Sequence, residues 1–108
     1  MPEGHVYILG SNTGTLYTGV TSDFDLRIFQ HRNGIKSGFA SKYGCNRLLL
    51  HERFTDIRAA IAREKVIKGW TRAKKLALIA RENPAFKDLG VYLGWRMLHP
   101  QQKIADQK

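Results

Sequence analysis

The side chain with the clearest chemical potential is Glu64, because it lies on an otherwise apolar helix face. Stepping back three, four and seven positions gives Ile61, Ala60 and Ile57, so the carboxylate should point toward the protein. Burying a carboxylate is costly unless a cation or hydrogen bonds compensate its charge. Three interpretations fit: an ion pair with a nearby Arg or Lys, a frayed edge of the apolar stripe where Glu64 reaches water, or a ligand of Mg²⁺. This ion is often bound through one or two carboxylates, waters and substrate phosphates.

Arg27 and His31 lie four residues apart in a second helical pattern, so both side chains should project from the same face. Arginine can hold a phosphate through two N–H donors and stays protonated at physiological pH. Histidine can exchange a proton near neutrality. The pair is suited to phosphate chemistry, and the alternative interpretation is two ordinary polar residues on an exposed helix face.

Tyr7 and Tyr17 occur in two short runs with strand composition, where most tyrosines are half-buried packing residues. Both rings share one face of a hairpin only if the residue opposite Tyr7 lies an even number of positions from Tyr17. That parity requires a hairpin loop with an odd number of residues. Gly19 would leave that face bare, so a ligand or backbone could approach closely.

Six elements are predicted to position these residues. Strands are expected over 5–9, 16–21 and 47–54, and helices from a cap at 21–23 to about 33, from Asp56 to Gly69, and from Thr71 to about Arg81. The order β-β-α-β-α-α predicts an α+β fold, a three-stranded antiparallel sheet flanked by helices.

The length of 108 residues predicts one domain, which we place at 1–96, followed by a polar tail over 97–108. The single cysteine, Cys45, cannot form an internal disulfide and has no zinc-ligand spacing around it. No apolar run has the length of a membrane helix, and the first residues do not resemble a signal peptide. We therefore expect a cytoplasmic protein with no membrane partner.

The net charge of +9 indicates a polyanionic partner, with a solvated basic surface as the alternative. The stretch 58–82 alone contains eight Lys or Arg and two Glu. Such clusters are typical of nucleic-acid binding. The basic residues expected to contact nucleic acid are Lys36, Lys42, Arg63, Lys68, Arg72, Lys74 and Lys75.

In chain order, the motif residues resemble the pattern of the GIY-YIG nuclease superfamily: Val6-Tyr7, Tyr17-Thr18-Gly19, Arg27, His31 and Glu64. The resemblance runs from His5 to about Asn83, and "LYTGVTSDFDLRIFQHRNG" and "AIAREKVIKGWTRAKKLALIARENP" resemble small standalone bacterial members. Two departures are visible. His5-Val6-Tyr7 replaces Gly-Ile-Tyr, and Tyr17-Thr18-Gly19 replaces Tyr-Ile-Gly, so the His5 side chain is expected near the site.

The resemblance implies metal-dependent hydrolysis of DNA phosphodiester bonds. By position, Tyr7 and Tyr17 match the motif tyrosines, one of which helps to deprotonate or orient the attacking water. Arg27 matches the arginine on the scissile phosphate, and His31 the position that relays a proton to a tyrosine. Glu64 matches the sole metal-binding carboxylate, for Mg²⁺ or alternatively Mn²⁺. Gly19 and Asn83 match positions that line or support the site.

Three functions are consistent with these residues. The first is an endonuclease with little sequence specificity, directed by DNA structure or by a targeting protein and acting as a monomer or weak dimer. The second is a non-catalytic nucleic-acid-binding module that retains the fold. The third, resting on charge alone, is a basic scaffold for a protein or ribosomal RNA.

Overall fold

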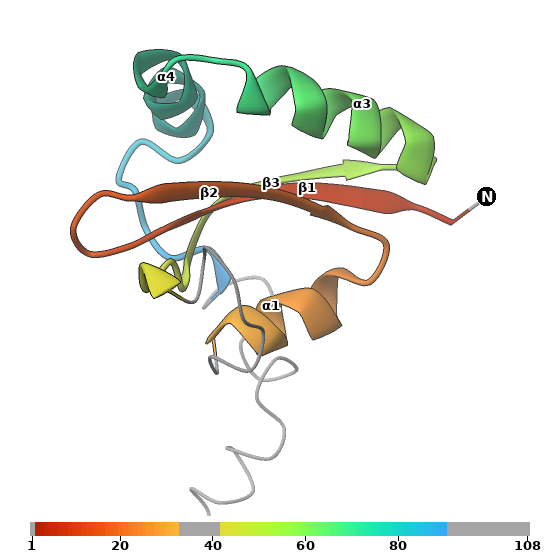
Figure 1. The fold of residues 1–108 in the computed structure, drawn as a ribbon, viewed down its shortest axis with the longest axis horizontal. Helices are drawn as coiled ribbons and strands as arrows, with labels where there is room; N and C mark the ends of the chain where they lie inside the picture. The colour runs from red at the N-terminus through yellow and green to blue at the C-terminus, as the bar shows by residue number, and fades with distance from the viewer. Residues whose placement is uncertain (1, 33–41, 91–108) are drawn as a thin grey trace, which may run out of the picture.

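The computed structural model describes residues 2–32 and 42–90. Its elements are β1 (Gly4–Gly10), β2 (Leu16–Thr21), α1 (Phe24–Arg32), β3 (Arg47–Phe54), α3 (Ile57–Lys68) and α4 (Arg72–Glu82). The three strands form one antiparallel sheet in the order β2-β1-β3 (Figure 1). The predicted α+β class, three-stranded sheet and element order are therefore confirmed.

The hairpin register brings both motif tyrosines to one face of the sheet. Tyr7 lies directly opposite Gly19, two positions from Tyr17, so the parity condition is met. The Ser11 backbone N–H donates to the Thr15 carbonyl at 2.9 Å, which leaves the three-residue loop 12–14 between the strands. The loop is odd-numbered, as the shared face requires.

Helices cover both faces of the sheet, with α1 on one face and α3 and α4 on the other (Figure 1). Every residue of β1 is buried, because this central strand is paired on both edges and covered on both faces. The apolar residues form one cluster on each face. The α1 side contains Tyr7, Leu9, Phe24, Ile28, Cys45 and Leu48, and the other side Val6, Ile8, Leu49, Leu50, Ala60, Ile67, Leu78 and Ile79.

The predicted helix ends are confirmed by their capping contacts. Asp56 accepts a hydrogen bond from the Arg58 N–H at 2.9 Å, and Gly69 ends α3. Thr71 accepts from the Lys74 N–H at 3.2 Å and so caps α4. These caps fix the turn between α3 and α4, which positions the basic residues on either side of it.

The buried face of α3 differs in detail from the predicted one. Ile61 is 38% exposed, so this face contains Ala60, Glu64 and Ile67 instead. On α4 the buried residues are Leu78 and Ile79, whereas the alanines at 73, 77 and 80 are exposed. The alanines of α4 offer little apolar surface, so Leu78 and Ile79 determine which side of that helix packs.

Some sequence predictions lie outside the described residues. They are the end of the first helix at about residue 33, Lys36, the domain boundary at 96 and the polar tail over 97–108. Within the described ranges, no helix is long and apolar enough to cross a lipid bilayer.

Candidate active site

Tyr7 of β1, Tyr17 of β2 and His31 of α1 form a compact aromatic group. The ring centroids are 6.3 Å apart for the two tyrosines, 5.8 Å for Tyr7 and His31, and 5.6 Å for Tyr17 and His31. The Tyr7 hydroxyl lies 3.2 Å from His31 Nε2. Tyr7 and His31 are buried, whereas Tyr17 is half-buried. The structure thus brings together three of the predicted site residues from three different elements.

The surroundings of Gly19 differ from those that the sequence predicts. A Cβ atom at this position would lie 2.5 Å from Tyr7 Cζ, so the Tyr7 ring packs directly over the glycine. The bare face expected at Gly19 is filled by the protein's own tyrosine, and not left open to a ligand. Because β2 is an edge strand, the ring extends toward the free edge of the sheet.

Burial raises the pKa of the Tyr7 hydroxyl to about 12. A hydrogen-bonding interaction with Arg27 and the charge of that guanidinium oppose the rise, whereas Tyr17 and Glu64 add to it. Arg27 from α1 and Glu64 from α3 therefore both act on the hydroxyl, although their helices lie on opposite faces of the sheet (Figure 1). Tyr7 is accordingly a neutral phenol at physiological pH.

Glu64 is buried, with 8% of its surface exposed, as its place on the inner face of α3 predicts. Its Oε2 lies 2.7 Å from Lys68 Nζ, one turn further along the helix, and the Lys68 side chain is 55% exposed. Glu64 raises the pKa of Lys68, and Tyr17 adds a smaller contribution. The ion pair therefore opens to solvent on the lysine side, and is not closed within the core.

The donor set around Glu64 fits a hard divalent cation. Among residues 2–32 and 42–90, no three His, Cys, Asp or Glu side chains are grouped as metal ligands. A closed zinc site needs four protein ligands, whereas Mg²⁺ usually keeps several waters and takes few carboxylates. A single carboxylate that is reachable from solvent suits the second kind of ion.

The basic residues predicted to contact nucleic acid differ in whether their charged groups already have partners within the protein. Arg63 makes two hydrogen bonds to Glu52, at 2.9 and 3.1 Å, and its guanidinium lies over the Trp70 ring. The Lys74 and Lys42 ammonium groups lie over aromatic rings, at 5.0 Å from the Trp70 centroid and 5.5 Å from the Tyr43 centroid. Lys68 is paired with Glu64, as described above.

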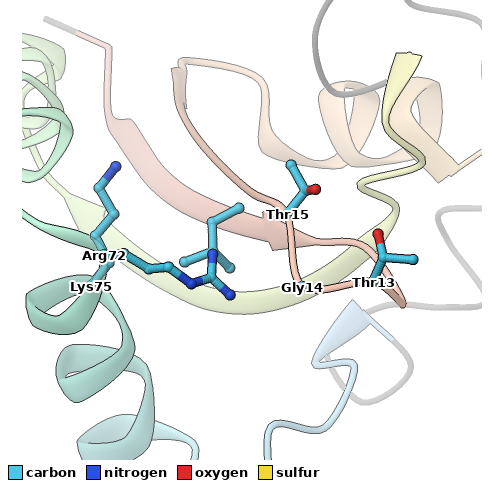
Figure 2. Close-up of a pocket in the computed structure, with 6 residues that line it drawn as sticks. Thr13, Gly14, Thr15, Arg72 and Lys75 are labelled. Carbon is cyan, nitrogen blue, oxygen red and sulfur yellow. The ribbon is translucent and has the colours of Figure 1, made fainter.

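Arg72 and Lys75 instead face an open concavity between α4 and the hairpin loop (Figure 2). Of the predicted contacts within the described residues, these two form neither an ion pair nor a cation–π contact.

The Asn83 side chain forms hydrogen bonds that link the end of α4 to β3. Its Nδ2 donates to the Leu49 carbonyl at 3.1 Å and to the Lys87 carbonyl at 2.9 Å, and its Oδ1 accepts from the Lys87 N–H. The side chain is buried. Its contacts hold the framework of the fold, so the supporting role expected for it has a physical basis.

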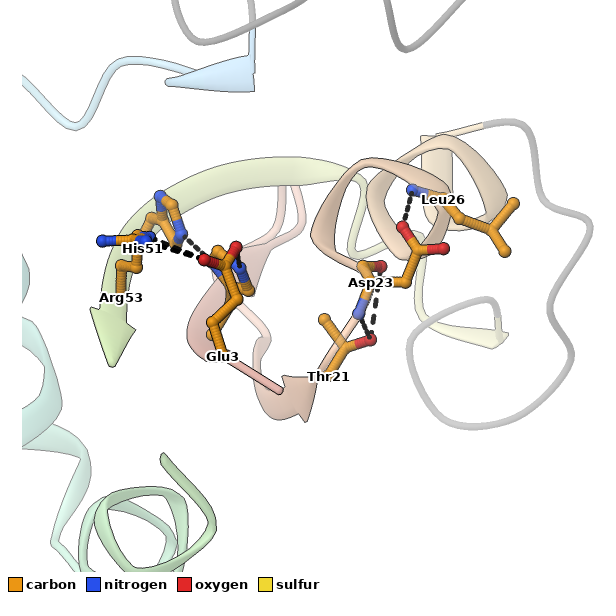
Figure 3. A network of polar contacts seen from close by, with 7 residues as sticks. Glu3, Thr21, Asp23, Leu26, His51 and Arg53 are labelled. Atoms are coloured by element: carbon orange, nitrogen blue, oxygen red, sulfur yellow. Dashed lines mark hydrogen bonds and ion pairs between the residues drawn. The ribbon is translucent and has the colours of Figure 1, made fainter. Parts of the chain in front are cut away.

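A pair of histidines lies beside the candidate site, and the sequence analysis identified only one of them. His5 Nδ1 lies 2.8 Å from His51 Nε2, and His5 Nε2 lies 2.7 Å from Glu3 Oε2, with Arg53 on the same carboxylate (Figure 3). The Phe24 and His51 rings stack, with centroids 3.9 Å apart. Burial lowers the pKa of His51 to about 4, and the nearby charges of His5 and Arg53 add to the effect.

His51 was not singled out by sequence reasoning, although His5 was. Its position follows from the pairing of β3 with β1, which places His51 directly opposite Tyr7. The pairing contains an irregularity between Ile8 and Leu9. No local sequence pattern indicates that irregularity. Only the alternation of side chains within β3 could have suggested on which face of the sheet His51 lies.

Comparison with known proteins agrees with this geometry. A family sequence model described as "GIY-YIG catalytic domain" matches residues 3–77. The chain is 35% identical over 79 residues to a UPF0213 protein of Staphylococcus epidermidis, covering 73% of this chain and 96% of that protein. It is 40% identical over 84 residues to a UPF0213 protein of Natronomonas pharaonis, covering 74% and 94% respectively.

A solved structure is also similar. The solution NMR structure of a UPF0213 protein from Bacillus halodurans matches with a TM-score of 0.54 and 30% sequence identity, covering 80% of this chain and 92% of that chain. The name UPF0213 states no activity. Function therefore has to be argued from the matched family and from the site.

Proposed function

Because the chain belongs to the GIY-YIG catalytic domain family, we propose that it is a metal-dependent endonuclease that hydrolyses phosphodiester bonds in DNA. The observation that carries the proposal is the convergence on the Tyr7 hydroxyl. His31 contacts it at 3.2 Å, and Arg27 and Glu64 both shift its pKa. Phosphodiester hydrolysis needs an activated water, a cation for the developing phosphoryl charge and stabilisation of the leaving oxygen, and these residues supply groups for each.

Tyr7 and His31 are suited to proton transfer as a pair. A phenol with a pKa of about 12 is almost never ionised at neutral pH. In a relay, the attacking water gives its proton to the Tyr7 oxygen while the Tyr7 proton passes to His31 Nε2. No free phenolate is then required. Tyr17, half-buried beside both rings, would orient the water, and Arg27 would hold the scissile phosphate through its N–H donors.

Glu64 would hold Mg²⁺, or Mn²⁺ in its place, as the one carboxylate of the group. Such an ion, when bound, acts as a Lewis acid toward the phosphate and the leaving oxygen. Lys68 would have to release the carboxylate first. The 55% exposed Lys68 side chain can be solvated after its release, and the metal ion would then compensate the charge of the buried carboxylate.

We further propose that DNA binding rests on phosphate contacts and has little sequence preference. Basic side chains binding a backbone give weak, strongly salt-dependent association, with Kd of order 10⁻⁴ to 10⁻⁶ M. Selectivity would then come from the structure of the DNA or from a partner protein that delivers the domain.

The test is nicking of supercoiled plasmid DNA with Mg²⁺ or Mn²⁺ by the wild type, Glu64→Gln and Arg27→Ala. Both variants should lose cleavage by on the order of a hundredfold or more, the scale of a lost charge-stabilising group. Glu82→Gln is the matched control, since Glu82 is an exposed helix glutamate paired with Arg81. Full activity in a folded Glu64→Gln protein contradicts the proposal.

One observation favours a second candidate, a binding module without turnover. The carboxylate that would take the metal is already paired with Lys68 at 2.7 Å. If that pair persists on DNA, the fold would bind without cutting. The same assay separates the two, because DNA binding with no cleavage in either metal supports the module.

A further inference from the structure

The concavity between α4 and the β1–β2 hairpin has the chemistry of a phosphate-binding site. It measures about 440 Å³ and is lined by Thr13, Gly14, Thr15, Leu16, Arg72 and Lys75. Figure 2 shows Arg72 reaching from α4 toward Gly14 of the hairpin. A Cβ atom on Gly14 would lie 3.1 Å from Arg72 Nη2, so the arginine closely approaches the loop backbone.

The two cations have no acidic partner among residues 2–32 and 42–90, whereas nearby cations do. Arg63 pairs with Glu52, Lys68 with Glu64 and Arg81 with Glu82. No ion pair is formed by Arg72 or Lys75 within this part of the chain. Two uncompensated positive charges in one concavity attract an anion.

The hairpin side of the concavity is ordered before any ligand arrives. Ser11 Oγ accepts hydrogen bonds from the N–H groups of Thr13 and Thr15, at 3.2 and 3.0 Å. Gly14 has φ of +95°, a conformation that favours glycine, and its N–H donates to the Ser11 carbonyl. The N–H groups of Thr13, Gly14 and Thr15 are therefore already used, so an anion would be held by the side chains of Arg72 and Lys75.

The concavity adjoins the candidate active site along β2. Thr15 precedes Tyr17 by two residues, which is about 7 Å of extended strand. Lys68, whose pKa is raised in part by Tyr17, lies four residues before Arg72, on the other side of the turn between α3 and α4. The concavity and the candidate active site therefore lie along the same edge strand of the sheet.

We propose that Arg72 and Lys75 form a second phosphate-binding site that holds the nucleic-acid backbone beside the candidate active site. The inference rests on the proposed function, because it takes the active site as the place where the strand is cut. Arginine supplies a planar pair of donors for the phosphate oxygens, and Lys75 adds a flexible charge. The site positions the backbone and carries no sequence information.

The test compares Arg72→Gln/Lys75→Gln with Lys65→Gln/Arg81→Gln, which removes the same charge from exposed positions outside the concavity. Binding of a fluorescent duplex is measured without metal at several salt concentrations. The first double variant should bind on the order of tenfold more weakly, and its salt slope should fall by about 1 for each phosphate that the protein no longer neutralises. The second should change far less.

Equal salt slopes in the two double variants would overturn the proposal. A titration with inorganic phosphate, followed through the Gly14 and Thr15 amide resonances, distinguishes a free phosphate from a backbone phosphate. Saturation by inorganic phosphate together with equal DNA binding would show that the site takes free phosphate and that the backbone contact is wrong. Since no metal is present, a slope difference supports this site even if the wild type fails to cleave DNA.

Discussion

The hydroxyl of Tyr7 lies 3.2 Å from Nε2 of His31, at the contact between β1 and α1. Both side chains are buried, with 0% and 7% of their surfaces exposed. The contact gives the tyrosine a proton acceptor that does not depend on bulk water. A buried phenol that would be a poor base alone therefore has a route for its proton.

The Tyr7–His31 contact predicts the pH dependence of cleavage. If a free Tyr7 phenolate were the base, its pKa of about 12 would make the rate rise tenfold per pH unit from pH 7 to 9.5. The relay through His31 instead predicts a nearly flat rate over that range. Single-turnover nicking at fixed ionic strength measures it. Tyr7→Phe should lose on the order of a hundredfold or more, and a tenfold rise per pH unit in the wild type would contradict the relay.

Gly19→Ala is expected to destabilise the protein by about 1–3 kcal/mol, the usual cost of overpacking a filled site. The added Cβ would lie 2.5 Å from Tyr7 Cζ, so the ring or the strand must shift. Gly69→Ala is the matched control, because its Cβ would meet nothing nearer than 3.5 Å. Urea unfolding measures both. Replacing Tyr7 by Leu in the Gly19→Ala background should recover part of the loss, and equal stability of both single variants would contradict the packing argument.

The sequence predicts the framework well because local signals determine it. Caps at Asp56 and Thr71, the stop at Gly69 and the third strand over 47–54 each depend on residues close in the chain, and all are confirmed. For Tyr7 and Tyr17 to share one face, the sequence required a hairpin loop with an odd number of residues. The observed register meets this requirement. The motif residues could be named because the family pattern is ordered along the chain.

The sequence could not predict side-chain partners that come from other elements. His51 depends on the pairing of β3 with β1, and that pairing contains an irregularity which no local pattern marks. The ion pair of Glu64 was one of three interpretations, and spacing alone could not tell that its partner is the exposed Lys68. The role of Gly19 also required the actual position of the Tyr7 ring over it.

The stability of the fold should fall as the pH drops from about 6.5 toward 4, because of His51. Its pKa is about 4 in the folded protein and 6.5 ordinarily, so the unfolded chain binds the proton first. The loss is at most about 3 kcal/mol, and less where water screens the ring. His51→Gln should flatten the curve in this window. Urea unfolding between pH 4 and 8 measures it.

Arg53 and Glu3 differ from His51 in the pH range over which they change charge. Arg53 stays charged throughout, and Glu3, whose pKa is lowered from 4.5 by Arg53 and then by His5, loses its contribution only as the pH falls below 4.5, at the lower end of the His51 window. Arg53→Gln is the comparison variant: it removes a charge that also lowers the pKa of His51, but burial, the largest cause, remains, so most of the slope should be kept. A His51→Gln protein with the wild-type slope between pH 6.5 and 4 would show that this histidine is not the source.

Lys68→Met should raise the affinity for Mn²⁺, because the cation that competes for Glu64 is removed while the aliphatic stem is largely kept. The ion pair spans 2.7 Å and joins a lysine that is 55% exposed to a buried carboxylate, so its competition is worth on the order of 1 kcal/mol. The gain is therefore roughly up to fivefold, measured by electron paramagnetic resonance of free Mn²⁺ during titration. Lys65→Met, an exposed lysine on the same helix, is the matched control. Glu64→Gln should abolish Mn²⁺ binding. If Lys68→Met binds Mn²⁺ no better than Lys65→Met, Lys68 does not compete with the metal ion for Glu64.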